Sequence, residues 1–436
     1  MSWATRFRVR QYVQESLWLL PLLAVVLGVV LGAVDVQVDK LVHLPTSWTY
    51  SSSTATTVLS AIVGAMAALT GFVVTVTVLV AQMAIGTFSA RFMRVWYRDP
   101  MLKAVLAVLI GALAFSFSLL RRVESNFVPN LGVSIAGALL VVSLLLFMVF
   151  LSRYLHRLRP VAVAVLVAGY VRREFKHLRD AVADEPDVFG GRFEADGEEP
   201  TFVLRSSVPG AVQAIDPEGL VGWARKHGCL LVVEPHVGQF VPAEATLARA
   251  YGGDPATAAD ERTLRGMFAL GTERTVDQDP AFAIRIIVDI ADKALSAAIN
   301  DPTTAVQVVD QLGEVLREIG TTNLERSRWS ENGGPRRGLV IPMRSWEEYL
   351  ALGVTEIREY GSTSIQVMRR MRAMLEQLRR EIPPEHRPAV DEELARLDAT
   401  VASSFGQSVD LDRARIADPL GMGGAIEPRR DQAVAH

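Results

Sequence analysis

The longest apolar stretch of the chain covers residues 57–83 and contains no Asp, Glu, Lys or Arg. A helix of that length rises about 40 Å, enough to cross a hydrocarbon core of about 30 Å with some tilt. Three further apolar stretches, at residues 17–34, 104–120 and 131–151, are also long enough to span a bilayer. The pattern therefore predicts an α-helical integral membrane protein with four transmembrane helices, all within residues 1–160.

The second of these stretches combines small and polar residues. Its small residues are Ala61, Gly64, Ala65, Ala68 and Gly71, and its polar residues include Ser60, Thr70, Thr75, Thr77 and Gln82. One interpretation is ordinary close packing inside a helix bundle, with hydroxyls bonded back to their own helix, and we favour it. The alternative is a pore-lining helix with Thr70, Thr75, Thr77 and Gln82 toward water and Arg91 and Arg94 at the cytoplasmic mouth.

The distribution of basic residues predicts the orientation of the spans. Arg and Lys precede the first span, lie between the second and third, and follow the fourth, whereas the loop after the first span is net acidic. Arg121 and Arg122, between the third and fourth spans, oppose this trend. By the positive-inside rule we expect a multi-pass protein of the cell inner membrane with both termini in the cytoplasm.

After the fourth span, the spacing of apolar and polar residues changes several times along the chain. Residues 161–183 are apolar at first and then charged, which predicts an interfacial connector helix, and residues 184–200 read as an acidic linker. Residues 201–255 show short β-like runs and predict a small β-rich module, residues 256–405 predict a helical domain, and residues 406–436 a mobile tail. Together these segments predict a cytoplasmic, helix-rich α+β domain.

Polar residues are concentrated between residues 271 and 304, beside strongly apolar ones. The candidates for a structural polar network are Glu273, Arg274, Asp277, Asp279, Arg285, Asp289, Asp292, Asn300 and Asp301. Arg–carboxylate pairs among them would fix the angle between neighbouring helices. A cation pocket is the alternative, but no calcium-loop spacing is present, so we favour the structural network.

His227, Cys229, Glu234 and His236 lie close together in the sequence and raise the question of a zinc site. The usual paired spacing of zinc ligands is absent, and Cys229 lies within an apolar run. A buried, unreactive cysteine is therefore the favoured interpretation, and we expect neither a metal nor a cofactor. As the single cysteine of the chain, Cys229 has no intramolecular disulfide partner, which fits a reducing compartment.

Catalytic and nucleic-acid-binding signals are missing from the sequence. It contains no G-x-S-x-G, Walker A, G-x-G-x-x-G or H-E-x-x-H motif. A formal net charge of −3 gives no basic field for nucleic acid. We therefore expect a protein that is not an enzyme and does not bind nucleic acid.

The string FAIRIIVDIADKALSAAINDPTTA (282–305), with GTERTVDQD before it and IREYG (357–361) after it, resembles the bacterial family called domain of unknown function 2254. The resemblance covers about residues 15–405, and INDPTTA (299–305) is its most specific part. Ala297-Ala298 stands where similar members carry Pro-Gly. The resemblance implies a membrane protein with several N-terminal spans and a cytoplasmic C-terminal region, and it implies no activity and no functional residues.

Two functional hypotheses remain for this architecture. One is an oligomeric ion channel, anion-passing or tension-gated, lined by the second span. The alternative is a membrane-tethered sensor or scaffold whose cytoplasmic domain binds an unidentified partner. The expected partners are the lipid bilayer and further copies of the chain, and coupled transport is disfavoured because no predicted span contains an ionisable side chain.

Overall fold

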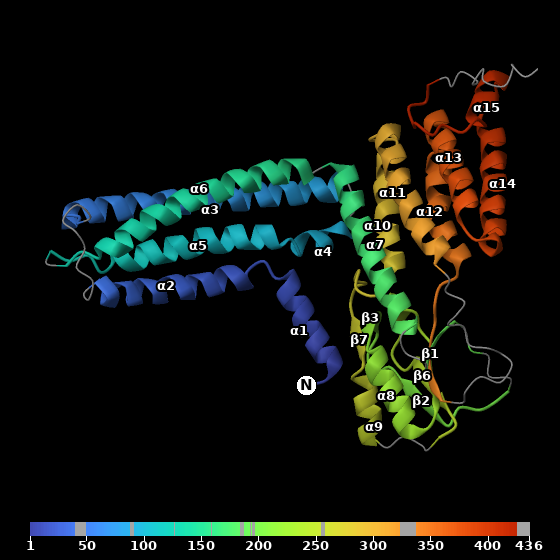
Figure 1. Ribbon diagram of the computed structural model, residues 1–436, viewed down its shortest axis with the longest axis horizontal. Helices are drawn as coiled ribbons and strands as arrows, with labels where there is room; N and C mark the ends of the chain where they lie inside the picture. The colour runs from blue at the N-terminus through green and yellow to red at the C-terminus, as the bar shows by residue number, and fades with distance from the viewer. Residues whose placement is uncertain are drawn as a thin grey trace, which may run out of the picture. The chain divides into compact units, whose positions relative to one another are not determined.

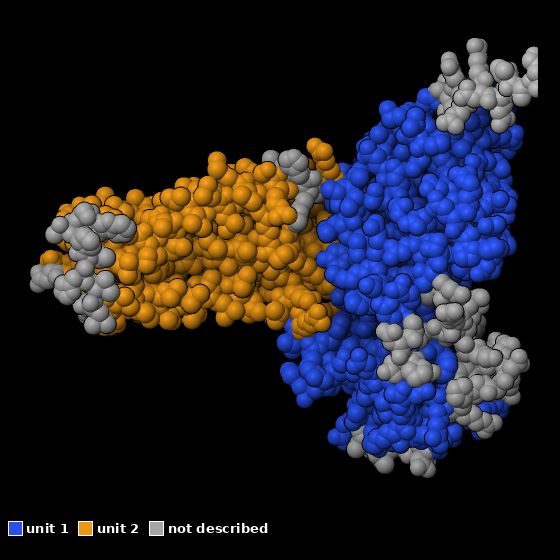
Figure 2. All heavy atoms as spheres, in the orientation of Figure 1, with its two compact units in different colours: residues 1–9, 87–89, 160–436 blue, residues 10–86, 90–159 orange. Residues whose placement is uncertain are grey.

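The computed structural model describes residues 1–39, 49–87, 91–125, 127–157, 159–183, 187–191, 193, 197–253, 258–322 and 337–424. The chain divides into two compact units, shown in Figure 2. We call residues 10–86 and 90–159 the membrane unit, and residues 1–9, 87–89 and 160–436 the C-terminal unit.

The membrane unit is built from long apolar helices (Figure 1). Four of them are long and apolar enough to cross a bilayer: α2 (Leu19–Asp39), α3 (Ser52–Thr87), α5 (Pro100–Leu120) and α6 (Asn130–Arg157). A short helix, α4 (Phe92–Tyr97), precedes α5, and α1 (Trp3–Glu15) precedes α2. The prediction of a mostly helical protein with four candidate membrane-spanning helices is confirmed, with helices longer than the predicted apolar stretches.

Helices α2 and α5 approach each other closely through small residues. A Cβ atom on Gly28 of α2 would lie 2.5 Å from the carbonyl oxygen of Gly111 on α5. One turn later, a Cβ on Gly32 would lie 2.8 Å from Oγ of Ser118. Close approach of apolar helices requires such small residues because bulkier side chains would hold the backbones apart.

The end of α2 carries two acidic residues that lie against the start of α6. Asp39 accepts hydrogen bonds from the backbone N–H groups of Asn130 (3.2 Å) and Leu131 (3.0 Å). Asp35 is only 6% exposed and lies against Gly132, where a Cβ would collide with its Oδ2. These carboxylates therefore complement the unpaired amides at the N-terminus of α6.

The helices that contain the first and third predicted spans carry ionisable side chains near their ends. The helix predicted to end at residue 34 continues through Asp35 and Asp39. Both lie against the start of α6, where Asp39 accepts two backbone amides, while Oδ2 of Asp35 has no hydrogen-bond partner among the described residues. Helix α5 likewise begins early enough to include Lys103, whose ammonium donates to the backbone carbonyl groups of Val13 and Gln14.

The C-terminal unit contains two β-sheets with a common core. A five-stranded sheet has the order β1 (Val188–Gly190), β8 (Gly338–Ile341), β4 (Leu230–Val233), β6 (Thr246–Tyr251), β2 (Phe202–Arg205). The first three strands are parallel, and β6 is antiparallel to both β4 and β2. The second sheet is antiparallel, in the order β5 (Phe240–Val241), β3 (Gly210–Ile215), β7 (Phe268–Gly271).

Alternation along β4 gives the five-stranded sheet two apolar faces. Leu231 and Val233 point into the core shared with the second sheet and with α8 (Pro217–His227). Leu230 and Val232 lie on the opposite face in a smaller cluster with Tyr251 and Val340. Successive side chains of a strand point to opposite faces, so both sides of β4 are covered.

The helices of the C-terminal unit alternate with its strands as far as β8, and the remaining helices follow both sheets in sequence. Beyond α8 they are α9 (Ala258–Arg265), α10 (Pro280–Leu295), α11 (Pro302–Thr321), α12 (Trp346–Tyr360), α13 (Ile365–Glu381), α14 (Arg387–Ser404) and α15 (Ser408–Ala414). Helix α7 (Pro160–Ala183) packs on α10 and α11 and buries an apolar face that includes Val163, Val167 and Phe175. The helix predicted at residues 161–183 is thus present, and one of its faces belongs to the core of the C-terminal unit.

Four helices start at an Asp-Pro pair. The carboxylates of Asp99, Asp216, Asp279 and Asp301 each accept a backbone N–H from the first turn, and the following proline occupies the first helical position. Proline is favoured there because its missing N–H would have no intrahelical partner and its φ angle is already helical.

Two segments predicted to lack regular structure contain it where the structure describes them. Strand β1 lies within the predicted acidic linker and pairs with β8. Within the predicted tail, α15 is followed by a segment that covers α13, because the buried Arg369 guanidinium donates to the carbonyl groups of Ile416, Gly423 and Gly424. Residues 184–186, 192, 194–196 and 425–436 of these two segments lie outside the described residues.

Candidate functional site

Helix α3 has one buried face and one exposed face, on which small and polar residues lie among large apolar ones such as Phe72, Val78, Leu79 and Met83. The buried face consists of Ala55, Leu59, Ile62, Met66, Val73, Thr77, Val80 and Ala84. The exposed residues that we call the α3 small face are Thr57, Ser60, Ala61, Gly64, Ala68, Gly71, Thr75 and Gln82. A Cβ on Gly64 or Gly71 would meet nothing within 4 Å in the part of the chain that the structure describes.

The four residues predicted to line a pore fall on different sides of α3. Thr75 and Gln82 belong to the α3 small face, Thr70 is half-buried, and Thr77 is buried. The hydroxyls of Thr70 and Thr75 donate to the carbonyl groups of Met66 and Gly71, one turn earlier. The Thr77 hydroxyl has no hydrogen-bond partner among the described residues. The structure thus places two of the four on one exposed surface.

The arginines predicted to form a cytoplasmic mouth lie at α4. Arg91 is exposed and directly precedes this helix, and Arg94 lies within it. Arg94 lies 3.9 Å from the Glu15 carboxylate, which forms a closer ion pair of 2.9 Å with Arg98. Glu15 therefore offsets part of the positive charge of this segment.

Arg274 and Asp279 form the first of two charge clusters among the predicted network residues. The Arg274 guanidinium donates to Oδ2 of Asp279 at 2.7 and 3.1 Å, while Oδ1 accepts the Phe282 amide of α10. Burial raises the pKa of Asp279 above its ordinary value, against the opposing effect of Arg274. The pair fixes the loop before α10 to the start of that helix.

Arg285 organises the second cluster, between α10 and α12. Its guanidinium lies 2.8 Å from Asp289 and 3.6 Å from Asp292, and it also pairs with Glu356 of α12. Burial, together with the neighbouring Glu356 carboxyl, raises the pKa of Asp292 to about 8. Three carboxyl groups thus share one guanidinium.

The remaining predicted network residues are Asp301, Asn300, Glu273 and Asp277. Asp301 caps α11 by accepting the Thr304 amide (3.0 Å) and hydroxyl (2.5 Å). Asn300 is exposed and has a left-handed backbone with φ of 48°. Glu273 is exposed, and its carbonyl accepts from the Gln213 side chain, while Asp277 is half-buried in the same loop. The structure therefore distributes the predicted network over two clusters and a helix cap.

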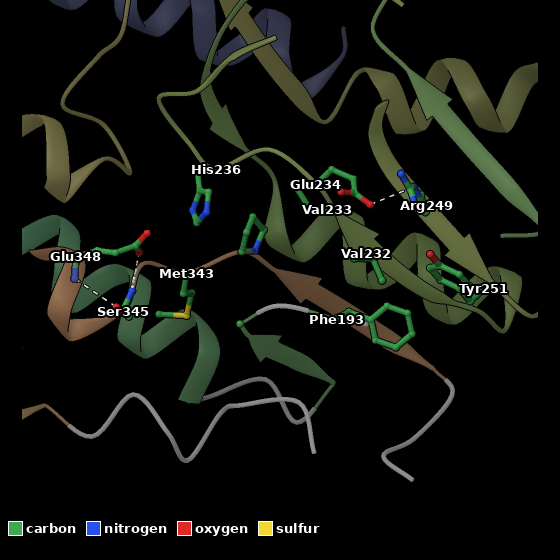
Figure 3. Close-up of a pocket in the computed structure, with 12 residues that line it drawn as sticks. Phe193, Val232, Val233, Glu234, His236, Arg249, Tyr251, Met343, Ser345 and Glu348 are labelled. Atoms are coloured by element: carbon green, nitrogen blue, oxygen red, sulfur yellow. Dashed lines mark hydrogen bonds and ion pairs between the residues drawn. The ribbon is translucent and has the colours of Figure 1, made fainter. Parts of the chain in front are cut away.

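A cavity of about 620 Å³ lies in the C-terminal unit beside the five-stranded sheet (Figure 3). It is lined by Gly191, Phe193, Val232, Val233, Glu234, His236, Arg249, Tyr251, Pro342, Met343, Ser345 and Glu348. Several of these residues directly follow the parallel strands β1, β4 and β8, whose carboxyl ends therefore meet at the cavity. In open α/β sheets this is the edge at which ligands bind.

The polar groups of the cavity are arranged in two pairs and a histidine. Glu234 and Arg249 form an ion pair of 3.1 Å, and Ser345 and Glu348 form the capping box at the start of α12. Burial and the nearby Arg344 lower the pKa of His236 below its ordinary value, which keeps the imidazole neutral at pH 7. Tyr251 and Phe193 provide an aromatic surface, with ring centroids 5.0 Å apart.

The structure separates the residues considered for a zinc site. Cys229 is buried and burial raises its thiol pKa to about 11, while His227 stacks on Trp223. Glu234 and His236 both line the cavity. No group of three or more His, Cys, Asp or Glu within the described ranges lies close enough to hold a metal ion.

Comparison with protein families gives a match over most of the chain. A family model described as "Predicted membrane protein (DUF2254)" matches residues 14–377. The chain belongs to this family. The DUF2254 match runs from α1 into α13 and so includes the α3 small face, both charge clusters and the cavity.

Known relatives of this DUF2254 chain occur in mycobacteria. It is 28% identical over 432 residues to Uncharacterized protein MT1328 and Uncharacterized protein Rv1290c, from two strains of Mycobacterium tuberculosis, and to Uncharacterized protein Mb1321c of Mycobacterium bovis. Each alignment covers 94% of this chain and 80% of the relative. No solved structure matches the chain.

Three groups of residues that the structure brings forward were missed by the sequence reasoning. Glu356 directly precedes the IREYG sequence (357–361), but no neighbouring residue in the sequence indicates that it faces Arg285. Arg249 and Tyr251 of the cavity are two residues apart on β6, and this spacing could have predicted that they lie on the same face of a strand. Asp35 and Asp39 directly follow the predicted first span and were assigned to a loop, so their position against the start of α6 was not predicted.

Proposed function

We propose that this DUF2254 protein assembles from several copies into an ion channel of the inner membrane, lined by the α3 small face. The observation that supports it is the run of exposed glycine, alanine and hydroxyl side chains, beside exposed apolar residues such as Val78 and Leu79, along a helix long enough to span the bilayer. Polar side chains are costly against lipid, and small ones are typical of helix–helix contacts, so this face needs a second protein surface or water.

The proposal includes an orientation and a selectivity. Both termini and the helix-rich α+β C-terminal unit lie in the cytoplasm, in keeping with the positive-inside rule. Arg91 and Arg94 then flank the cytoplasmic end of α3 and favour anions, with Glu15 offsetting part of their charge. Gating by membrane tension fits a pore formed by packed small residues. The proposal assigns no enzymatic activity, cofactor or nucleic-acid partner.

Two neighbouring threonines provide a matched test of the pore. Thr75→Leu places an apolar side chain on the α3 small face and should change single-channel conductance, whereas Thr77→Val alters the buried face and should leave conductance unchanged. Arg91→Glu should reduce the preference for anions. A conducting preparation in which neither Thr75→Leu nor Arg91→Glu changes the current would exclude α3 as the lining.

A second candidate function is supported by the cavity at the strand ends. On this proposal the protein is a membrane-tethered sensor or scaffold, whose C-terminal unit responds to a ligand or partner while the spans anchor and oligomerise it. Reconstituted protein would then be electrically silent, and a small ligand would raise the thermal unfolding midpoint of the wild type but not of Arg249→Ala. Robust single-channel currents with no ligand-dependent change in stability would contradict the sensor.

A further inference from the structure

The cavity beside the five-stranded sheet has the location and size of a small-molecule site. Three parallel strands end at it, and helix α12 begins there, which is where open α/β sheets bind their ligands. Its volume of about 620 Å³ falls within the range of about 300–1,000 Å³ that is typical of ligand pockets.

One wall of the cavity offers adjacent hydrogen-bond acceptors and donors. Arg249 Nε lies 3.1 Å from Glu234 Oε1, and both side chains are partly exposed. The second carboxylate oxygen and the two terminal guanidinium nitrogens add a further acceptor and further donors to this pair. A ligand edge with a donor beside an acceptor matches this pair, because a carboxylate only accepts and a guanidinium only donates.

The adjoining surface is apolar and aromatic. Val232 and Tyr251 belong to the smaller apolar cluster of the sheet, and Phe193 packs against that cluster (Figure 3). Aromatic rings favour contact with other planar rings, in stacked or edge-to-face geometry. A planar ring with a hydrogen-bonding edge therefore fits both surfaces.

The charge of the lining disfavours an anionic ligand. Glu234 and Glu348 contribute two carboxylates, Arg249 contributes one guanidinium, and His236 is neutral at pH 7. The N-terminus of α12, an attractive place for a phosphate, is already occupied by the Glu348 side chain in its capping box. The lining thus selects against phosphorylated ligands.

We propose that this cavity binds an uncharged nucleobase or nucleoside, with a guanine-type edge on the Glu234–Arg249 pair and the ring plane against Tyr251 and Phe193. Guanine carries acceptors at O6 and N7 and donors at N1 and N2, which complement the guanidinium and the carboxylate. The inference specifies the ligand of the second candidate function and rests on it.

Calorimetric titration of the full-length protein in lipid nanodiscs with guanosine tests this assignment. Glu234→Gln and Arg249→Ala should each weaken guanosine binding by about tenfold or more, because each removes a hydrogen bond to a charged group. Arg205→Ala, which removes an exposed arginine of the same sheet outside the cavity, should leave affinity unchanged. Adenosine and guanosine monophosphate should bind more weakly than guanosine.

Several outcomes would overturn the ligand assignment. They are the absence of guanosine binding to wild-type protein, binding unaffected by both cavity substitutions, and tighter binding of the monophosphate than of the nucleoside. Unfolding midpoints show whether Glu234→Gln and Arg249→Ala remain folded. If one of the two variants does not fold, the other still tests the assignment. A different small molecule that stabilises the wild type but not Arg249→Ala would refute guanosine while leaving the sensor function standing.

Discussion

Asp292 faces two other carboxyl groups, those of Asp289 and Glu356, across the single guanidinium of Arg285. Burial and the neighbouring Glu356 raise the pKa of Asp292 to about 8. In the unfolded chain the same carboxyl group loses its proton at about pH 4. Between these values the folded state binds more protons than the unfolded state. The free energy of unfolding should therefore fall as the pH rises toward about 8.

Replacing Asp292 by Asn should flatten this pH dependence. The amide is neutral at every pH, so the variant should lose less stability than the wild type between about pH 5 and about pH 9. Fluorescence-detected unfolding of the full-length protein across this range measures the effect. Glu385→Gln, at an exposed carboxylate, provides the control and should follow the wild type. Parallel curves for wild type and Asp292→Asn would contradict the prediction.

Asp279 and Asp301 allow a comparison of two aspartates with the same cap geometry. Asp301→Ala removes a helix cap and should cost about 1 kcal/mol of unfolding free energy. Asp279→Ala removes a cap and also leaves the partly exposed Arg274 guanidinium without its carboxylate, which should raise the cost to about 2 kcal/mol. Denaturant titration of both variants measures the difference, and equal losses would show that the Arg274 pair contributes nothing.

At the scale of single elements, local signals in the sequence predicted helix starts well. Asp216-Pro217 and Asp301-Pro302 each begin a helix, and both pairs can be read from the sequence because a cap and its proline act within one turn. The pairing of β1 with β8 was not predictable in this way, since the two strands are far apart in sequence. The cavity was missed for the same reason, because its lining comes from the ends of three such strands.

Glycines distinguish the helices that pack within one chain from the face that we propose to pack between chains. Gly28→Leu should destabilise the membrane unit by about 2 kcal/mol or more, since its side chain would meet the backbone of Gly111. At Gly71 an added Cβ would meet no described atom within 4 Å, so Gly71→Leu should leave the fold of one chain intact while changing the association between chains. Unfolding midpoints and size-exclusion profiles of both variants separate the two effects. A large loss of stability in Gly71→Leu with unchanged association would refute this distinction.

At the scale of the whole molecule, the number of subunits tests the channel, because a pore lined by one helix of each chain requires several chains. The membrane unit of one chain has four candidate spans, and the glycines of its α3 small face meet no described atom. Native mass measurement in lipid nanodiscs gives the subunit number directly. A closed ring of three or more chains would allow α3 to surround a symmetry axis, as the channel requires. Gly71→Leu should then shift the mass toward smaller assemblies, whereas an exposed substitution in the C-terminal unit such as Glu385→Gln should not. A strictly monomeric protein would remove the pore and leave the α3 small face in contact with lipid, and the sensor would become the leading function.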